Sequence, residues 1–193
     1  MTMRAATHSR TLAEIVQRQA GVCRASVAAD PGRDDQLTVF VLTERVGEPD
    51  ASALGRAVAA AGGLEAVDVR FVFLNPLLAG RAAPTGEPPA VSDATALERL
   101  LQTVWALFLK RERVEMDDDI LRLGAHSLHV IRVVSMLESL FGIDVPIHLI
   151  LDHPVIRDQA AMLRARTDGA PLAAAAAAIL HVVDAAATPQ ALA

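Results

Sequence analysis

The chain has 193 residues, enough for one medium domain or two small ones, and 52% are hydrophobic but only 3% aromatic. A net charge of −5 without an evident basic patch excludes a nucleic-acid binder, because phosphates require clustered Lys and Arg. The single cysteine, Cys23, is expected in the core and suits a reducing cytoplasm. No apolar tract reaches the roughly 20 residues that cross a bilayer, so no membrane partner is expected.

Residues 1–83 are predicted to form a small α+β sandwich, in which two helices cover a three-stranded sheet in the order α-β-β-α-β. Thr11 and Glu14 have the spacing of a capping box, and Asp50 can cap the second helix. The middle strand is nearly all apolar, which predicts that other elements cover both of its faces. The strands are expected at residues 22–27, 37–42 and 67–74, and the helices at 11–21 and 50–61.

The segments Ala20-Gly21-Val22, Leu37–Leu42 and Phe71–Leu74 carry a resemblance to the small C-terminal subdomain of the adenylate-forming ligases in nonribosomal peptide synthetases. In that family the subdomain ends in a glycine–lysine turn, whose lysine stabilises charge during acyl-adenylate formation. Here the corresponding stretch is Leu77–Arg81, and the only lysine of the chain, Lys110, lies in a later helix. We therefore expect a non-catalytic or docking domain. The alternative is a domain that still closes over a separate adenylating partner.

Residues 84–93 are predicted to be a connector, because three prolines and a glycine cannot sustain a helix or a strand ladder. Residues 94–167 then show the spacing of an all-α four-helix bundle. Thr95 and Glu98 have the spacing of a second capping box at the start of its first helix. The later helices are expected from Ser127 to Phe141, from Pro146 to Leu151 and from Pro154 to about residue 167.

Ser127 follows a small-residue turn and opens the second of these helices. A serine at a helix start is normally an N-cap worth about 0.5–2 kcal/mol, and this structural role is the alternative to a functional one. Its surroundings are Asp118-Asp119, Leu123-Gly-Ala-His-Ser-Leu128, Phe141-Gly142 and Asp152-His-Pro154. In this register they resemble a peptidyl carrier protein, or thiolation domain, of nonribosomal peptide synthesis.

The resemblance implies that a phosphopantetheinyl transferase attaches the 4′-phosphopantetheine arm of coenzyme A to Ser127. The thiol of the arm would hold an aminoacyl or peptidyl group as a thioester. No catalytic residue is implied, so a carrier is expected and not an enzyme. The implied partners are the transferase, an adenylation enzyme that loads the arm, and a downstream condensation or tailoring enzyme of antibiotic or other secondary metabolism. Leu128, Arg132 and Met136 are the expected face that partners contact.

Two residues depart from the family pattern. Ala125 replaces a glycine, which costs about 1–2 kcal/mol if the site needs a positive φ. Arg122 replaces a residue that is commonly acidic, which is expected to alter the choice of partner. The acidic run Asp117–Asp119 is expected to be a solvated loop that can meet basic residues of a transferase. In the helix that follows, Ile131 belongs to one of two apolar rows.

Two other functions stay open. One is a split adenylate-forming ligase, in which another chain supplies the large nucleotide-binding subdomain. The other is a scaffold that is loaded but serves mainly to recruit. A metal site is not expected, because the histidines lack tight ligand spacing and a cysteine partner. The histidines concerned are His126, His129, His148 and His153.

Residues 168–193 include six consecutive alanines and are expected to be a frayed helix or disordered, because a lone helix of this length is marginal in water. A docking helix for a downstream enzyme is the alternative. The start at Met1-Thr2-Met3 favours a free-standing protein.

Overall fold

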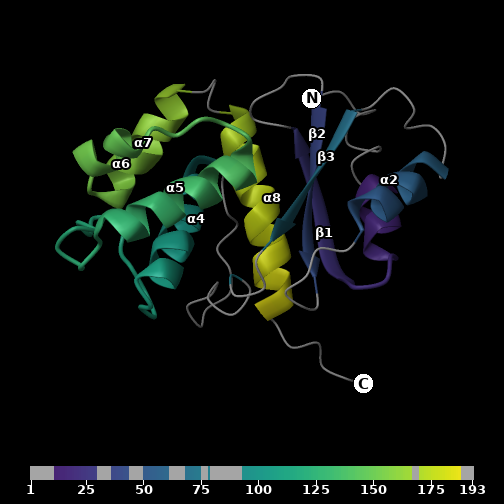
Figure 1. Ribbon diagram of the computed structural model, residues 1–193, viewed down its shortest axis with the longest axis horizontal. Coiled ribbons are helices and arrows are strands. Elements are labelled where there is room, and N and C mark those ends of the chain that lie inside the picture. The colour runs from purple at the N-terminus through teal and green to yellow at the C-terminus, as the bar shows by residue number, and fades with distance from the viewer. Residues whose placement is uncertain are drawn as a thin grey trace.

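The computed structural model describes residues 11–29, 36–43, 50–60, 68–74, 78, 93–166 and 170–187, which arrange in layers (Figure 1). The layers are a helical bundle, a single long helix, a three-stranded sheet and a pair of short helices. The predicted connector lies outside the described residues except for its last residue. The elements are a helix at 11–17, β1 (Val22–Ala29), β2 (Gln36–Thr43), α2 (Ala51–Ala60), β3 (Asp68–Leu74), α4 (Asp93–Phe108), α5 (Ser127–Phe141), α6 (Ile147–Asp152), α7 (Ile156–Arg166) and α8 (Ala170–Ala187).

The central strand of the sheet is β2, which pairs antiparallel with β1 and parallel with β3. Because side chains alternate along a strand, Val39 and Val41 pack in the core under α2 and the helix at 11–17. Phe40 and Leu42 belong to the core on the other face. All four side chains are buried, which confirms that both faces of this strand are covered. The predicted α-β-β-α-β order is also confirmed.

The C-terminal segment forms α8, which lies between the bundle and the sheet (Figure 1). Leu172, Ile179 and Val183 are almost fully buried, and α8 packs against both β1 and α4. Burial of this apolar surface supplies the stabilisation that a lone alanine-rich helix lacks. The expectation of a frayed or disordered tail is therefore wrong for residues 170–187. The docking-helix alternative also fails here, because neighbours within the chain already occupy the apolar faces of α8.

The four helices α4 to α7 form the predicted bundle. Trp105 of α4 is fully buried, and its Nε1–H donates to Oε1 of Gln159 on α7 over 2.8 Å. The next helix, α5, starts at Ser127 as predicted and ends at Gly142, whose φ of 69° is left-handed. The N–H of Gly142 donates to the carbonyl of Glu138 over 2.8 Å, which closes the helix. The predicted limits of α5 are therefore confirmed.

The predicted capping box of α4 is wrong. This helix starts at Asp93, so Thr95 and Glu98 lie inside it. Glu98 is only 9% exposed and forms an ion pair with Arg164 of α7. Its carboxylate therefore links two helices, and does not cap the start of one. Local spacing could not reveal this role, because the partner lies 66 positions further along the chain.

Arg70 of β3 connects the sheet to the bundle. Its guanidinium donates to the carbonyls of Ser139 (3.3 Å) and Leu140 (3.2 Å) near the C-terminal end of α5. A positive charge at this end of a helix is favourable, because the helix dipole is negative there. Gly142 lies against the same guanidinium, since a Cβ at this glycine would be 2.9 Å from Nη1 of Arg70. The sheet and the bundle also share one hydrophobic core with α8.

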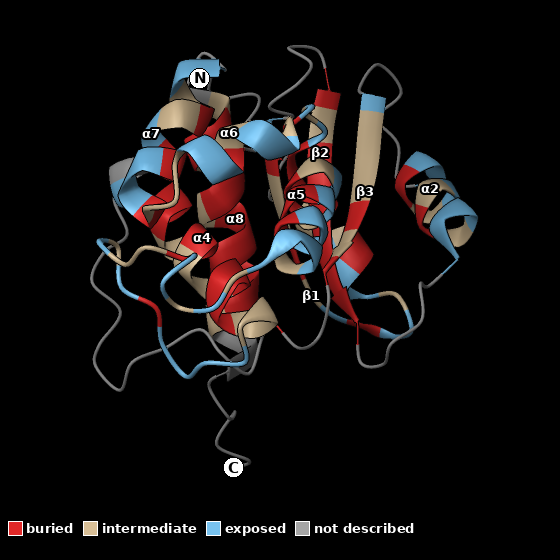
Figure 2. Cartoon of the chain, turned by 60° about the vertical axis from the view of Figure 1, so that its left-hand side comes forward, coloured by how far each residue is buried: buried red, intermediate tan, exposed pale blue. Residues whose placement is uncertain are grey.

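Burial follows these layers, with buried residues concentrated in α8 and α4 and exposed residues on the outer side of α5 (Figure 2). Cys23 is exposed, so its expected place in the core is wrong. It lies at a register shift between Val22 and Arg24, where the alternation of inward and outward side chains is interrupted. Among the described helices, none has the length and apolar character needed to cross a membrane.

Candidate functional site

Ser127 is the first residue of α5 and is exposed. The N-cap is the preceding residue, His126, which has extended backbone angles (φ −134°, ψ 175°). The N–H of His126 donates to Nδ1 of His129 over 3.4 Å. The Ser127 hydroxyl makes no hydrogen bond within the part of the chain that the structure describes. Ser127 therefore does not cap its own helix, and its hydroxyl is open to an approaching enzyme.

The first turn of α5 leaves backbone donors beside this hydroxyl. The carbonyl of His126 accepts from the amides of His129 (2.8 Å) and Val130 (3.1 Å), which are the first bonds of the helix. The amides of Ser127 and Leu128 find no acceptor among the described residues. Unpaired amides and the positive end of the helix dipole both stabilise an anion. A phosphate ester on Ser127 thus fits the groups that are present.

The approach to Ser127 is a tight turn at Gly124. Gly124 has a φ of +97°, and a Cβ there would meet nothing within 4 Å. A glycine is needed here because the φ angle is positive, and not because a side chain would lack space. The N–H of Ala125 donates to the carbonyl of Ile120 over 2.9 Å, and its φ is not positive. The cost of about 1–2 kcal/mol that a positive φ would impose at Ala125 therefore does not arise.

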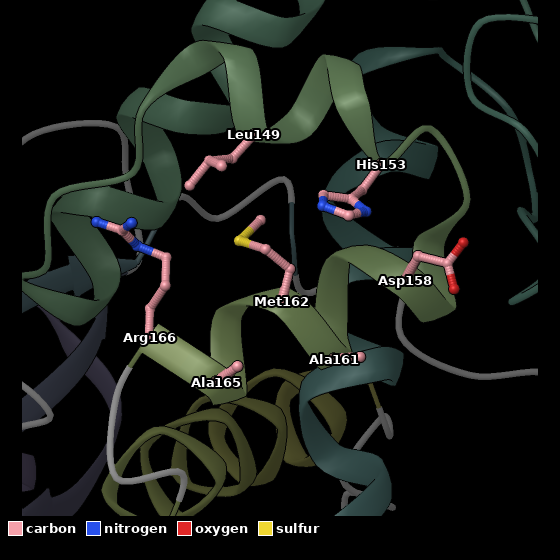
Figure 3. Close-up of a pocket in the computed structure, with 7 residues that line it drawn as sticks. All are labelled: Leu149, His153, Asp158, Ala161, Met162, Ala165 and Arg166. Carbon is pink, nitrogen blue, oxygen red and sulfur yellow. The ribbon is translucent and has the colours of Figure 1, made fainter.

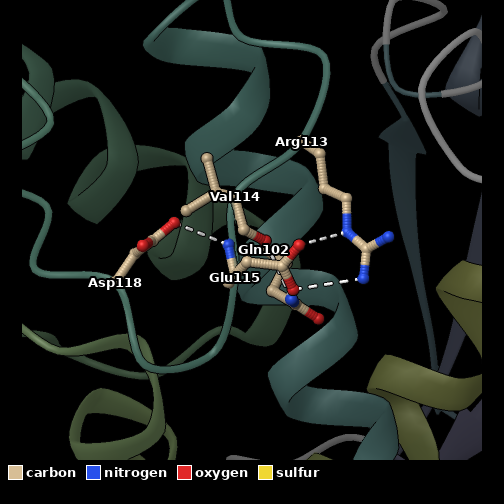
Figure 4. A network of polar contacts seen from close by, with 5 residues as sticks. All are labelled: Gln102, Arg113, Val114, Glu115 and Asp118. Carbon is tan, nitrogen blue, oxygen red and sulfur yellow. Dashed lines mark hydrogen bonds and ion pairs between the residues drawn. The ribbon is translucent and has the colours of Figure 1, made fainter.

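Each member of the acidic run before this turn has a partner. Asp117 accepts two hydrogen bonds from Arg157 of α7 (2.8 and 3.1 Å), and this guanidinium holds the pKa of Asp117 below its usual range. Asp118 accepts from the N–H of Glu115 over 2.8 Å (Figure 4). Asp119 accepts from two backbone amides of the following turn, at 2.9 and 3.3 Å. The acidic run does lie in a solvated loop, as expected, since the side chain of Asp117 is 77% exposed. The carboxylates also organise this loop through their hydrogen bonds.

The same loop is held from two further sides. Nε2 of Gln102 on α4 donates to the carbonyl of Val114 over 2.8 Å (Figure 4). Ile120 is fully buried, and its N–H donates to the carbonyl of Pro154, just before α7, over 2.9 Å. The segment that leads to Ser127 is thus fixed to α4 and α7, which positions the serine before any partner binds.

Two histidines flank Ser127. The rings of His126 and His129 lie with their centroids 4.0 Å apart. Burial lowers the pKa of His129, and the nearby charges of His126, Arg132 and Lys110 lower it further. In the residues that the structure describes, no group of three or more His, Cys, Asp and Glu side chains could hold a metal ion.

The structure brings two of the three predicted partner residues to the surface. Leu128 is 50% exposed and Arg132, one turn further along α5, is exposed as well. Met136 is only partly exposed and packs against the core. Ile131, expected in an apolar row, is 45% exposed, and its i+3 spacing from Leu128 is the signal that places both on one side of the helix. The other large exposed hydrophobic residues are Leu121, Ile147 and Leu151.

Cations gather around the same helix start, although the sequence shows no basic patch. Nη2 of Arg111, just after α4, donates to the carbonyl of Leu123 in the turn before Ser127, over 3.4 Å. Lys110 is near enough to lower the pKa of His129. Lys110 and Arg111 are adjacent in the sequence, but the sequence does not show that they lie beside the turn before Ser127. We call the group formed by Lys110, Arg111, Arg122 and Arg132 the basic rim.

A groove of about 600 Å³ lies along α6 and α7 (Figure 3). None of the residues that line it belongs to α5 or to the turn at Gly124, so the groove is a separate feature. The lining residues are Leu149, His153, Asp158, Ala161, Met162, Ala165 and Arg166.

Comparison with known protein families matches residues 99–163 to the family described as "Phosphopantetheine attachment site". The chain is 36% identical over 92 residues to phosphinothricin tripeptide synthetase PhsB of Streptomyces viridochromogenes, a match that covers 44% of this chain and 8% of that protein. It is 32% identical over 112 residues to tyrocidine synthase 3 of Brevibacillus parabrevis, which covers 51% of this chain and 2% of that protein. The chain thus spans less than a tenth of these relatives.

Two solved structures are also similar to parts of the chain. BlmI, a type-II acyl carrier protein of Streptomyces verticillus, has a TM-score of 0.37 and 27% identity, covering 38% of this chain and 88% of that one. Holo-AB3403, a four-domain nonribosomal peptide synthetase, has a TM-score of 0.36 and 20% identity, covering 81% of this chain and 13% of that one.

Proposed function

We propose that this chain, whose residues 99–163 are a phosphopantetheine attachment domain, is a non-enzymatic carrier that holds an aminoacyl or peptidyl group on an arm attached to Ser127. One observation carries the assignment to this serine. Ser127 is the exposed first residue of α5, its hydroxyl is unbonded within the described structure, and two unpaired amides lie beside it. Such a site accepts a phosphate ester without rearrangement.

The attachment is a phosphoryl-type transfer from coenzyme A. The Ser127 oxygen forms a bond to the phosphorus that bears the pantetheine, while the pyrophosphate bond to the nucleotide breaks. Adenosine 3′,5′-bisphosphate leaves, and the hydroxyl proton passes to a base of the transferase. The N–H groups at the start of α5 then hold the phosphodiester anion. The arm supplies a terminal thiol, which carries the acyl group as a thioester.

The proposed partners follow from this chemistry. A phosphopantetheinyl transferase must reach Ser127, an adenylation enzyme must load the thiol, and a condensation or tailoring enzyme must remove the acyl group. The names of the similar proteins, a tripeptide synthetase and a tyrocidine synthase, support nonribosomal peptide synthesis as the setting. We place the contact face for these enzymes at Leu128, Arg132 and Met136, of which Leu128 and Arg132 are exposed. The cytoplasm is the compartment that suits these partners.

Residues 1–83 are proposed to be a non-catalytic domain that supports the carrier domain at 94–167, with 84–93 as the connector. The only lysine of the chain, Lys110, lies beside the turn that precedes Ser127, so the N-terminal domain offers no lysine for adenylate chemistry. Of the stretch Leu77–Arg81, where the family has its lysine, only Leu78 is described, and it is buried in the core. These features favour the carrier over the split-ligase alternative.

Mass spectrometry after incubation with coenzyme A and a broad-specificity phosphopantetheinyl transferase tests the proposal. We expect the intact mass to rise by one phosphopantetheine. Ser127→Ala is expected to abolish the gain, whereas Ser135→Ala, at an exposed serine two turns along α5, should leave it intact. No gain in the wild-type chain, or a gain that survives in Ser127→Ala, would overturn the assignment.

A further inference from the structure

The basic rim surrounds the start of α5 in a chain whose net charge is negative. The side chain of Arg122 is 88% exposed, and Lys110, Arg111 and Arg132 are exposed residues. Arg111 is fixed beside the turn by its bond to the Leu123 carbonyl. The surface inside the rim is apolar, because Leu128 and Ile131 are both exposed to roughly half of their full extent.

Carboxylates close to the rim only partly offset its charge. Asp119 lies 3.5 Å from Arg122, but its side chain is largely covered and already accepts two backbone amides. Glu112 is exposed and next to Arg111 in the sequence. The four cations of the rim thus outnumber these two carboxylates, whereas acidic residues are in excess in the chain as a whole.

The distance at which each partner enzyme must act from Ser127 indicates which of them covers the surface inside the basic rim. Enzymes that act on the acyl group react at the far end of a long flexible arm and need not touch Ser127. The enzyme that attaches the arm has no such freedom, because the Ser127 oxygen itself must enter its active site. Residues within one or two turns of Ser127, including Leu128 and Arg132, are then buried under that enzyme.

We propose that the phosphopantetheinyl transferase that modifies this chain docks through an acidic-edged apolar surface, with its carboxylates facing the basic rim and its apolar centre on Leu128 and Ile131. This proposal rests on the proposed function, because it concerns the enzyme that modifies Ser127. Opposite charges at the edge of such a contact raise the association rate and set the orientation of docking. A neutral or basic transferase surface would lack this attraction.

Steady-state loading kinetics test the proposal, with a broad-specificity transferase that loads the wild-type chain, the chain as varied substrate and saturating coenzyme A. Arg132→Glu is expected to lower kcat/KM for the chain about tenfold, and Lys110→Glu with Arg132→Glu to lower it further. Raising the salt concentration should slow the wild type and leave the double variant nearly unchanged. Arg18→Glu, at an exposed site on the N-terminal domain, makes the same charge change and should load like the wild type.

Several results would overturn the proposal. One is unchanged loading of Arg132→Glu. Another is a higher KM for coenzyme A with an unchanged KM for the chain, which would assign the cations to the phosphates of coenzyme A. If the wild-type chain binds phosphatidylserine vesicles and Arg132→Glu abolishes this binding, the rim would be assigned to a lipid surface. If the wild type dimerises in sedimentation and Arg132→Glu abolishes the dimer, the rim would be assigned to contact with a second copy. A wild-type chain that takes up no arm at all would instead overturn the proposed function.

Discussion

Nη2 of Arg70 on β3 lies 3.2 Å from the backbone carbonyl of Leu140, and this bond joins the sheet to the end of α5. A second bond from Nη1 reaches the carbonyl of Ser139 over 3.3 Å. One side chain of the sheet thus satisfies two carbonyls of the last turn, where the helix leaves acceptors unpaired. The contact couples the helix that begins at Ser127 to the three-stranded sheet.

Arg70→Ala is expected to destabilise the chain by about 1.5 kcal/mol, because it removes charge-assisted hydrogen bonds to otherwise unpaired carbonyls. Urea unfolding measures this as a lower midpoint at constant slope. Arg56→Ala is the control, because Arg56 forms only an exposed ion pair with Asp50 over 3.5 Å and should have little effect. Equal losses in both variants would show that Arg70 is no more than a surface charge.

Trp105→Phe is expected to cost about 3 kcal/mol, because it shortens a fully buried side chain and leaves Oε1 of Gln159 without its donor. Gln159→Leu alone leaves the indole N–H unpaired and should also destabilise. The double variant should cost less than the two single losses together, because both polar groups are then gone. If the stability losses of the two single variants are simply additive in the double variant, as measured by thermal or urea unfolding, the Trp105–Gln159 hydrogen bond is not coupled to the packing.

Ile179→Ala in α8 is expected to destabilise the chain by about 2–5 kcal/mol, because Ile179 is fully buried between the sheet and the bundle. His181→Ala on the exposed side of the same helix should shift stability by no more than about 0.5 kcal/mol. Differential scanning calorimetry distinguishes the two variants. A wild-type stability in Ile179→Ala would mean that α8 is not part of the core in solution.

The pKa of His129 should lie below 6.5 before loading and rise after it, because a phosphodiester on Ser127 stabilises the nearby imidazolium. Titration of the His129 ring protons by NMR, before and after loading, measures both values. While the folded pKa is lowered, the folded chain binds fewer protons than the unfolded chain. The stability of the unmodified chain should therefore fall as the pH drops through about 6.5. An unchanged pKa after loading would place the phosphate away from His129.

Ser127→Ala should change the free energy of unfolding by no more than about 0.5 kcal/mol, because His126 and not Ser127 occupies the N-cap. The expected loss of arm attachment in this variant would then report on chemistry and not on folding. Far-UV circular dichroism and urea unfolding provide the check. A loss in the range of a true cap, about 0.5–2 kcal/mol, would mean that the serine stabilises the helix start.

Local patterns predicted much of this molecule. The apolar run at residues 37–42, the turn before Ser127 and the stop at Gly142 each depend on neighbouring residues, and the structure confirms the elements they define. The match of residues 99–163 confirms the carrier-protein resemblance of the helical domain. These features depend on backbone preferences and short-range spacing, which a single sequence contains.

Long-range contacts account for what could not be predicted. α8 packs against β1 and α4, and Glu98 has its partner on α7. Asp117 similarly meets Arg157, 40 positions away. Lys110 and Arg111 of the basic rim are adjacent in the sequence, but Arg122 and Arg132 come from two other segments, so only the fold shows that the four belong together. In each case folding brings together groups whose separation along the chain hides their relation.

The anchoring of α5 at Arg70 has a consequence for how an acyl group would move under the proposed function. A helix of 15 residues is about 22 Å long, with the sheet bonded at one end and Ser127 at the other. Under the proposed function, the arm on Ser127 would start at the end of α5 opposite the contact with Arg70. The sheet, α8 and the bundle share one hydrophobic core. Delivery of the acyl group would then depend mainly on the rotatable bonds of the arm, and we expect partner enzymes to bind around the start of α5.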